Sequence, residues 1–390
     1  MNDPIKNGYI NWIDGMKISK DHFIDMQRAT EDRVRDARSI LSGEFDMGLL
    51  AGKLKGRGSL EYIMTVGHPN RIDVEVYQCR ALSPAGDRVE IVSDLNSLTN
   101  ALKANFVIDL EKAEDQDIFD IIVKVDSFNM TPYGEPDVKE SPPRHPFAQP
   151  EYTLELAPSK EIQYNEYNRN YVVLTRVQLS GGVIKHLKDY IPPCMSMESA
   201  AELTEFYFKY LQFVKDLEQN ALHIIIKTNS AEHKTPLVRN VELIARRVFD
   251  LIEKEIDDVV LFYRFENPVH FVAHTMRLAR CIKNSIELTT NTGKDELLNY
   301  FSTEVMDLNS AEYMNVLSGL FGMEYQHYDI NACLTRISSF CKHTSKLFNE
   351  LSRLDYIGKK KDIGIFVTDK TKEDTASAPP ETQKVGFLKP

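Results

Sequence analysis

Two histidines four residues apart are the first side chains in this sequence that could do chemistry. His270 and His274 lie in a segment expected to be helical, where residues four apart share a face and could bind one metal ion. Phe271 stands where the zinc-protease motif HExxH has its glutamate base. The pattern therefore favours an ordinary helix face, and we predict no metal site.

A run of glycines is the second candidate. Glycines recur between residues 43 and 58, with Lys53 and Lys55 among them, and such loops can cradle phosphates. Their spacing does not match a P-loop, and the flanks do not give a strand and a helix in the required order. We interpret the run as turns between strands and predict no cofactor.

Nucleophiles are present but lack the neighbours that would activate them. The sequence has no G-x-S-x-G elbow and no pair of cysteines at CxxC spacing. The acidic residues between 253 and 258 read as solvated charge on a helix. We therefore predict no catalytic residues, no disulfide framework and a reducing compartment for the five cysteines, Cys79, Cys194, Cys281, Cys333 and Cys341.

The overall charge narrows the possible partners. Among 390 residues, 58 are acidic and 47 are basic, for a formal net charge of -11. This balance argues against a nucleic-acid-binding surface. The longest apolar runs are far shorter than the roughly 20 residues that cross a bilayer, and the N-terminus does not resemble a signal peptide. We expect a cytoplasmic protein, without direct membrane insertion, that reaches a membrane only through partners.

The first half of the chain is expected to carry one helix and many short strands. Residues 9–13 look strand-like, and a helix is expected over 20–41, capped by Ser19, with a weak apolar stripe and a solvated charged face over residues 31–38. Alternation and β-branched residues predict strands over 72–79, 88–91, 119–125 and 171–177, and a proline-rich irregular loop over the sheet. This succession of short strands and turns predicts an N-terminal β-sandwich domain over residues 1–190.

The second half is expected to be a helical bundle over residues 194–356. Helix starts are indicated by Ser199 with Glu202, by Pro236 after Thr235, by Pro268 after Asn267, and by Asp329. Aromatic residues crowd the first helix on several faces, which suits either burial in the core or contact between copies. The candidates for an oligomer interface are Phe206, Tyr210, Phe213 and Leu217. Residues 357–390 are expected to be a flexible or partner-ordered tail.

The opening segment carries a resemblance to a known family. Residues 10–23 read I-x-W-x-x-G-M-x(5)-H-F, and Trp12 within it is the single tryptophan of the chain. This is similar to the N-terminal signature of the TssK family of type VI secretion baseplate proteins, with Asp14 in place of the usual glutamate. Residues 79–86 and the junction at 190–193 also resemble that family, and the matching features cover about residues 8–310.

The resemblance implies a structural adaptor with no enzymatic activity. TssK-like proteins have a β-sandwich shoulder, a helical neck and a C-terminal head, and they form homotrimers that join TssF/TssG-like wedge proteins to a membrane complex at the inner membrane. Here helical pattern continues to about Leu354, so the multidomain α+β fold is expected to have a head that is reduced or merged with residues 295–356.

Two further expectations concern the N-terminal segment and the rival functions. Trp12, Met16, His22 and Phe23 are expected to face the wedge, although Trp12 and Phe23 could instead fill the shoulder core. A phage-type tail or baseplate receptor-binding protein of the same architecture is the alternative function. An enzyme with a β domain and a helical lid is a third possibility, but the sequence lacks the cluster of convergent polar residues that a catalytic site needs.

Overall fold

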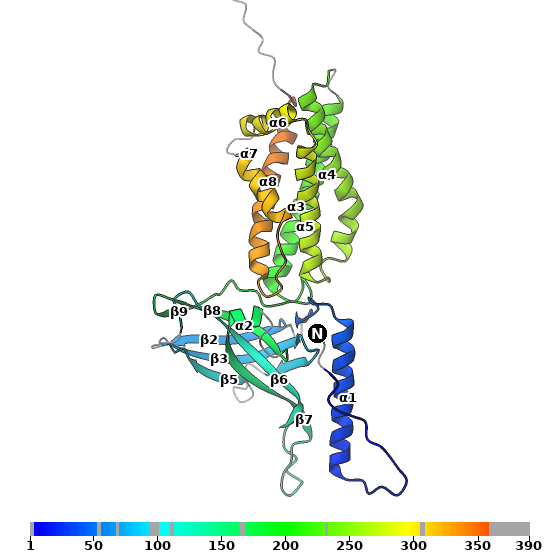
Figure 1. The fold of residues 1–390 in the computed structure, drawn as a ribbon, viewed down its shortest axis with the longest axis vertical. Helices are drawn as coiled ribbons and strands as arrows, with labels where there is room; N and C mark the ends of the chain where they lie inside the picture. The colour runs from blue at the N-terminus through cyan, green and yellow to red at the C-terminus, as the bar shows by residue number, and fades with distance from the viewer. Residues whose placement is uncertain are drawn as a thin grey trace, which may run out of the picture. The chain divides into compact units, whose positions relative to one another are not determined.

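The structure is a computed structural model of mixed α+β class (Figure 1), as the sequence predicts. It describes residues 4–52, 56–67, 70–93, 101–109, 113–163, 169–230, 233–304 and 309–358. The expected tail lies outside these residues from Lys359 onward. Strands come first along the chain, with one long helix before them and most of the helices after them. None of the helices in the described part combines the length and apolar character needed to cross a bilayer.

One sheet is built around β3 (Arg71–Leu82). Its partners are all antiparallel, and β4 and β5 pair with successive halves of the strand, at Gln78–Leu82 and Arg71–Val76. Ile72, Val74 and Val76 alternate with charged residues and point into the core, as their period of two predicts. The other strands of this sheet are β1 (Gly48–Leu49), β2 (Leu60–Gly67), β4 (Arg88–Val92) and β5 (Leu102–Val107).

The second sheet has the order β7-β6-β8-β9, also antiparallel, and the two sheets share one hydrophobic core. Figure 1 shows the strands of both sheets lying together below the helices that follow them in the chain, with α1 (Lys20–Leu41) beside the strands. The short helix α2 (Ser159–Gln163) follows β7 directly and contacts β6. The strands are β6 (Ile118–Tyr133), β7 (Phe147–Pro158), β8 (Tyr171–Ser180) and β9 (Val183–His186).

The proline-rich stretch was predicted as an irregular loop over the sheet, and this is correct only in part. Residues 134–146, with four of the six prolines, form an irregular connection between β6 and β7, but the stretch begins and ends inside these two strands. Strand β6 pairs with β8 only as far as Lys124, yet it continues to Tyr133, paired with β7 alone. Pro132 and Pro150 lie within this two-stranded extension. A proline cannot donate to a ladder, so it is tolerated where one side of a strand has no partner.

Helix α1 (Lys20–Leu41) begins after Ser19 as predicted, but the expected faces are wrong. Phe23, Met26 and Leu41 of the predicted apolar stripe are exposed, whereas two residues of the predicted solvated face, Asp32 and Arg35, are buried. The reason is that α1 meets the sheets near β6 and at the turn around Gly86, and the N-terminal segment covers Asp32 and part of Arg35.

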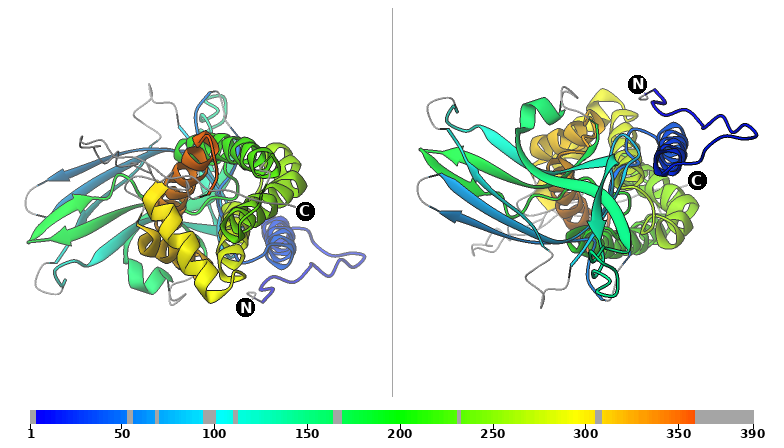
Figure 2. Two further views of the ribbon diagram at one scale, coloured as in Figure 1. Left: turned by 90° about the horizontal axis from the view of Figure 1, so that it is seen from above. Right: turned by 90° about the horizontal axis from the view of Figure 1, so that it is seen from below.

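Six helices of the described residues form the bundle, and the left view of Figure 2 looks down onto it. Side-chain caps stand where the sequence places them, at Thr235, Asn267 and Asp329, each accepting a hydrogen bond from a backbone N–H of the first turn. The predicted box of Ser199 and Glu202 is wrong, because the helix begins one residue beyond Ala200. The helices are α3 (Ala201–Asn229), α4 (Pro236–Leu261), α5 (Pro268–Glu287), α6 (Asn291–Glu304), α7 (Ser310–Phe321) and α8 (Ile330–Arg353).

The segment that connects the sheets to the bundle makes a close backbone contact with β1 at Gly48. The N–H of Leu49 donates to the carbonyl oxygen of Pro193 at 2.8 Å, and the N–H of Met195 donates to that of Leu49 at 2.9 Å. Gly48 has φ +98°, and a Cβ atom there would lie 2.1 Å from the Pro193 oxygen. Only glycine fits this position.

Candidate interaction site

Residues 4–19, here called the N-terminal hook, run back along α1 without forming a helix or a strand. The predicted strand over residues 9–13 is therefore wrong: within the part of the chain that the structure describes, no strand pairs with it, and side chains of α1 contact the segment instead. The hook turns at Asp14–Gly15, where the N–H of Met16 donates to the carbonyl oxygen of Ile13 and Gly15 has φ +79°. Such a positive φ suits glycine.

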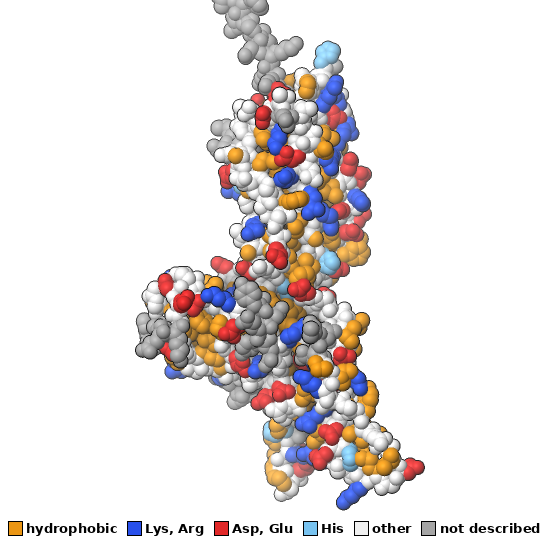
Figure 3. Space-filling model, in the orientation of Figure 1, with side chains coloured by type: hydrophobic (Ala, Val, Ile, Leu, Met, Phe, Trp, Pro, Cys, Tyr) orange, Lys and Arg blue, Asp and Glu red, His pale blue; other side chains and the backbone are white. Residues whose placement is uncertain are grey.

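The hook presents apolar side chains to solvent. Trp12 is 48% exposed and Phe23, at the start of α1, is 54% exposed, so neither fills the core. Met16 and His22 are half-buried. Figure 3 shows hydrophobic side chains gathered at the lower end of this face, over α1 and the segment beside it. Other large apolar side chains that are exposed in this region are Tyr9, Ile13, Ile18 and Met26.

The four predicted residues of this segment occupy one end of α1. The rings of Trp12 and His22 have centroids 5.9 Å apart and are tilted by 57°. The backbone N–H of Ser19 donates to Nδ1 of His22 at 3.0 Å, which ties the start of the helix to the imidazole. The ring of His22 thus supports Trp12 on one side and caps the helix on the other.

A buried carboxylate holds the beginning of the hook. Oδ2 of Asp32 accepts hydrogen bonds from the backbone N–H groups of Lys6 at 2.6 Å and Asn7 at 2.7 Å, and from Nδ2 of Asn7 at 3.2 Å. Its Oδ1 accepts from Nη2 of Arg35 at 2.8 Å, and Arg35 also donates to the carbonyl oxygen of Pro4 at 3.3 Å.

The pKa of Asp32 shows that this carboxylate stays ionised. Burial opposes ionisation, but the hydrogen bonds from Arg35, Asn7 and Lys6 together outweigh it and lower the pKa of the Asp32 carboxyl. Sequence reasoning missed this anchor, because the spacing of Asp32 and Arg35 looks like an ordinary surface pair on a helix. The only feature of the sequence that could have indicated this anchor is an aspartate followed by an arginine three positions later.

The four residues predicted for an oligomer interface pack inside the chain's own bundle. Tyr210, Phe213 and Leu217 are buried, and Phe206 packs edge-on against Phe271 with ring centroids 5.8 Å apart. Tyr210 also meets Phe271, at 4.5 Å between centroids. Within this chain, these aromatic residues therefore pack in the core of the bundle, which is one of the two explanations that the sequence allowed.

A different set of apolar residues is exposed on the bundle. Phe208 of α3 and Leu261, Phe262 and Phe265 near the end of α4, here called the bundle patch, all face solvent, Phe265 with 61% of its surface. The guanidinium of Arg264 lies 5.4 Å from the ring centroid of Phe208 and 5.7 Å from that of Phe265, so it joins the two rings. Phe208 does not share the spacing of three and four that relates the buried residues of α3, and this is the feature of the sequence that indicates its exposure.

The structure separates the two histidines weighed as metal ligands. His270 is exposed and lies 3.8 Å from Glu266, whereas His274 is buried and bonded to Tyr210. Among the described residues, no group of three or more His, Cys, Asp or Glu side chains could hold a metal ion.

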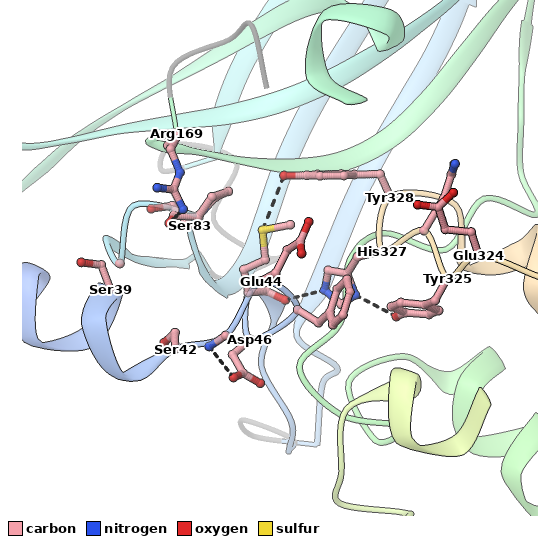
Figure 4. A pocket seen from close by; sticks show the side chains of 16 residues that line it. Ser39, Ser42, Glu44, Asp46, Ser83, Arg169, Glu324, Tyr325, His327 and Tyr328 are labelled. Carbon is pink, nitrogen blue, oxygen red and sulfur yellow. Dashed lines mark hydrogen bonds between the residues drawn. The ribbon is translucent and has the colours of Figure 1, made fainter. Parts of the chain in front are cut away.

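A recess of about 740 Å³ lies where the hairpin turn after β3, the segment 42–47 and the loop before α8 come together (Figure 4). His327 stands at its wall, with Nδ1 2.8 Å from the hydroxyl of Tyr325 and Nε2 3.0 Å from the carbonyl oxygen of Met47. Burial lowers the pKa of His327 to about 4. Because both ring nitrogens are engaged, His327 offers no free base to a ligand in the recess.

No protein-family model matches this chain, and no curated protein matches it. Solved structures do. A crystal structure of TssK matches over 86% of this chain and 68% of its own length, with 14% sequence identity and a TM-score of 0.51.

Two larger assemblies contain chains that also match. The baseplate complex from the type VI secretion system matches over 89% of this chain and 99% of its own, at 14% identity and a TM-score of 0.46. A chain of the TssK-TssF-TssG baseplate subcomplex matches over 87% of this chain and 99% of its own length, with 12% sequence identity and a TM-score of 0.45. At the level of the fold, the resemblance drawn from the N-terminal motif is confirmed by the TssK crystal structure, and the chain has a TssK-like fold.

Proposed function

We propose that this chain is a structural adaptor subunit of a type VI secretion baseplate and not an enzyme. It acts as a homotrimer that joins TssF/TssG-like wedge proteins to membrane-complex proteins, on the cytoplasmic side of the inner membrane. Two independent lines support the proposal: the TssK-like fold, and the N-terminal motif around Trp12 and His22. The observation that carries it is the exposed apolar hook, held in a defined shape against α1.

The proposed domain layout follows the strands and the helices. Residues 1–190 form the shoulder and residues 194–356 form the neck, with the head reduced or merged with residues 295–356. The described strands fall in the first range and α3 to α8 in the second, which supports this division. The hydrogen bonds between Leu49, Pro193 and Met195 would keep the two parts in register.

The hook is proposed as the contact with the wedge. Trp12 and Phe23 offer large aromatic surfaces, and interfaces obtain much of their binding free energy from a few such residues. His22 lies against the ring of Trp12, and Met16 is half-buried in the same segment. A cluster of exposed apolar side chains at the end of a projecting helix is unfavourable in water unless a partner covers it. The identity of the partners as TssF/TssG-like proteins rests on the motif's resemblance.

The trimer contact is proposed to lie on the outward side of α3. Exposed residues recur there at alternating spacings of three and four, so they share one side of the helix, and three of them, Phe208, Leu222 and Ile226, are large and apolar. This surface includes Phe208 and so continues into the bundle patch. It replaces the buried residues first considered for this role. These exposed residues are Glu205, Phe208, Gln212, Lys215, Gln219, Leu222 and Ile226.

Co-purification with the wedge proteins tests the proposal. The full chain is expressed together with TssF-like and TssG-like proteins encoded by the same genome, and a tag on one wedge protein is used for capture. Recovery of this chain as a trimer, by light scattering after size exclusion, is the expected result. A chain that stays monomeric at micromolar concentration and is not captured would contradict it.

A further inference from the structure

The hook is attached to α1 by hydrogen bonds at its two ends, and between them ring contacts join it to the helix: the ring centroid of Tyr9 lies 4.7 Å from the guanidinium of Arg33, and Trp12 lies against His22. At one end, Asp32 holds the backbone of Lys6 and Asn7. At the other, Ser19 begins the helix. Between these points, the exposed residues Trp12 and Ile13 lie on a stretch without regular secondary structure. A stretch of this kind keeps one shape only if both of its ends are fixed.

Asp32 differs sharply from another acidic residue on the same helix. Asp25 pairs with Arg28 at the same spacing, i to i+3, with 3.8 Å between Oδ1 and Nη1, but both side chains are about half exposed. Asp32 pairs with Arg35 at 2.8 Å, and its side chain has no exposed surface. A buried carboxylate is costly unless it is fully hydrogen-bonded, and the donors that satisfy Asp32 come from the hook.

We propose that Asp32 is a positioning residue for partner binding: it holds the hook in its binding shape before the partner arrives. The effect on binding rests on the proposed function, since it assumes that the hook is the contact. The physical basis is preorganisation. A segment that must be ordered on binding loses conformational entropy at that moment, and a segment already ordered does not. Asp32 would therefore determine affinity without touching the partner.

Trp12 makes this inference measurable without any partner, because it is the single tryptophan of the chain. Time-resolved fluorescence anisotropy and acrylamide quenching of the full-length protein then report on the hook alone. In Asp32→Ala we expect a larger share of fast local motion and at least about twofold stronger quenching than in the wild type. Asp25→Ala is the matched control, with the same residue type, helix and arginine spacing, and should behave as the wild type.

Two further variants keep the test decisive if Asp32→Ala lowers the stability of α1. Deletion of residues 2–7 removes the donors and leaves the helix sequence intact, so it should raise the mobility of Trp12 to a similar extent. Combining the deletion with Asp32→Ala should add little, because both changes remove the same interaction. Equal mobility of Trp12 in the wild type, in Asp32→Ala and in the deletion would overturn the inference.

Binding then separates the two proposals. With TssF/TssG-like proteins as the probe, Asp32→Ala is expected to weaken binding at least about tenfold, and Asp32→Asn, which keeps one acceptor oxygen, by less. If replacing Trp12 and Phe23 by alanine leaves binding unchanged, the proposed contact through the hook fails, while the mobility of Trp12 in Asp32→Ala still decides whether Asp32 holds the hook. If Trp12 becomes mobile in Asp32→Ala but binding is unchanged, preorganisation is contradicted and the contact itself is not.

Discussion

Inside the helical bundle, the hydroxyl of Tyr210 on α3 lies 2.7 Å from Nδ1 of His274 on α5. Both side chains are buried. On the other side of the ring, Nε2 lies 3.4 Å from Oε2 of Glu255 on α4. When the tyrosine donates to Nδ1, the proton of the neutral imidazole is on Nε2 and points towards Glu255. His274 therefore links α5 to Tyr210 on α3 and to Glu255 on α4 inside the bundle.

Removing the Tyr210 hydroxyl should destabilise the bundle from within. Tyr210→Phe keeps the aromatic packing and leaves Nδ1 of His274 buried without a donor, which is expected to lower the free energy of unfolding by about 1–3 kcal/mol. Urea unfolding followed by circular dichroism measures this. Tyr133→Phe, at an exposed tyrosine, is the control and should change the free energy by less than about 0.5 kcal/mol. An equal effect of the two variants would contradict the proposed role of the Tyr210 hydroxyl.

The protein should lose stability as the pH falls from about 6.5 towards 4. Burial lowers the pKa of His274 to about 3 and that of His327 to about 4. Below the ordinary histidine pKa of about 6.5, the unfolded chain binds protons that the folded chain does not, so stability decreases as the pH falls. Each such histidine contributes a slope of up to about 1.4 kcal/mol per pH unit.

Urea unfolding at several pH values between 4.5 and 7.5 measures this slope. Replacing His274 or His327 by asparagine is expected to flatten the curve in that range, whatever its effect on stability at pH 7. His270→Asn, at an exposed histidine four residues from His274, is the control for the substitution itself. A wild-type curve that is flat from pH 4.5 to 6.5 would contradict the neutral state of both buried histidines.

The helical half was predicted well because its signals are local. Thr235, Asn267 and Asp329 cap their helices through bonds to residues two or three positions away, so short segments of sequence contain the whole interaction. The strand β3 and its turn into β4 were predicted for the same reason.

The hook and its anchor could not be predicted, because their partners are distant in sequence. Asp32 accepts hydrogen bonds from Asn7 and Lys6, which precede it by 25 and 26 positions, and no periodic pattern in the sequence predicts a contact over that distance. The outward position of Phe208, beside the buried Tyr207, depends in the same way on which side of α3 the other helices cover. The resemblance of the N-terminal motif therefore pointed to Trp12 and His22, but not to the residue that holds their segment in place.

Gly48→Ala should damage the junction between sheets and bundle. The added Cβ would meet the Pro193 carbonyl oxygen at 2.1 Å, and the residue has φ +98°, so both contact and backbone conformation oppose it. We expect a loss of about 2–4 kcal/mol, from combined overpacking and strain. Gly58→Ala, where an added Cβ meets nothing within 4 Å, is the control. Thermal melts of both variants decide the matter, and an unchanged melting temperature for Gly48→Ala would contradict the close contact.

A buried ion pair in the second sheet provides another test. Nε of Arg176 lies 2.6 Å from Oδ1 of Asp120, and the guanidinium lies 4.3 Å from the ring centroid of Tyr190. Asp120→Ala leaves a buried positive charge without its partner, which is expected to cost about 3–5 kcal/mol. The double variant Asp120→Ala/Arg176→Met should recover most of that loss.

The exposed pair of Arg71 and Asp73 supplies the comparison for this buried pair. Both of these side chains are about half exposed, so Asp73→Ala should cost much less free energy of unfolding than Asp120→Ala. Chemical denaturation of the four proteins measures all the differences under one set of conditions. If Asp120→Ala and Asp73→Ala had the same effect, the pair in β6 and β8 would not be buried as the structure has it.

The adaptor role is tested most directly by the affinity of the hook for the wedge. The binding of immobilised TssF/TssG-like proteins is measured for the wild-type chain and for the variant Trp12→Ala/Phe23→Ala, with Tyr133→Ala as a control at an equally exposed aromatic residue. All three proteins should have the same helix content and the same oligomeric state. A dissociation constant at least about tenfold higher for the hook variant, and unchanged for the control, is the expected result. Equal affinities for all three proteins would contradict the hook as the wedge contact.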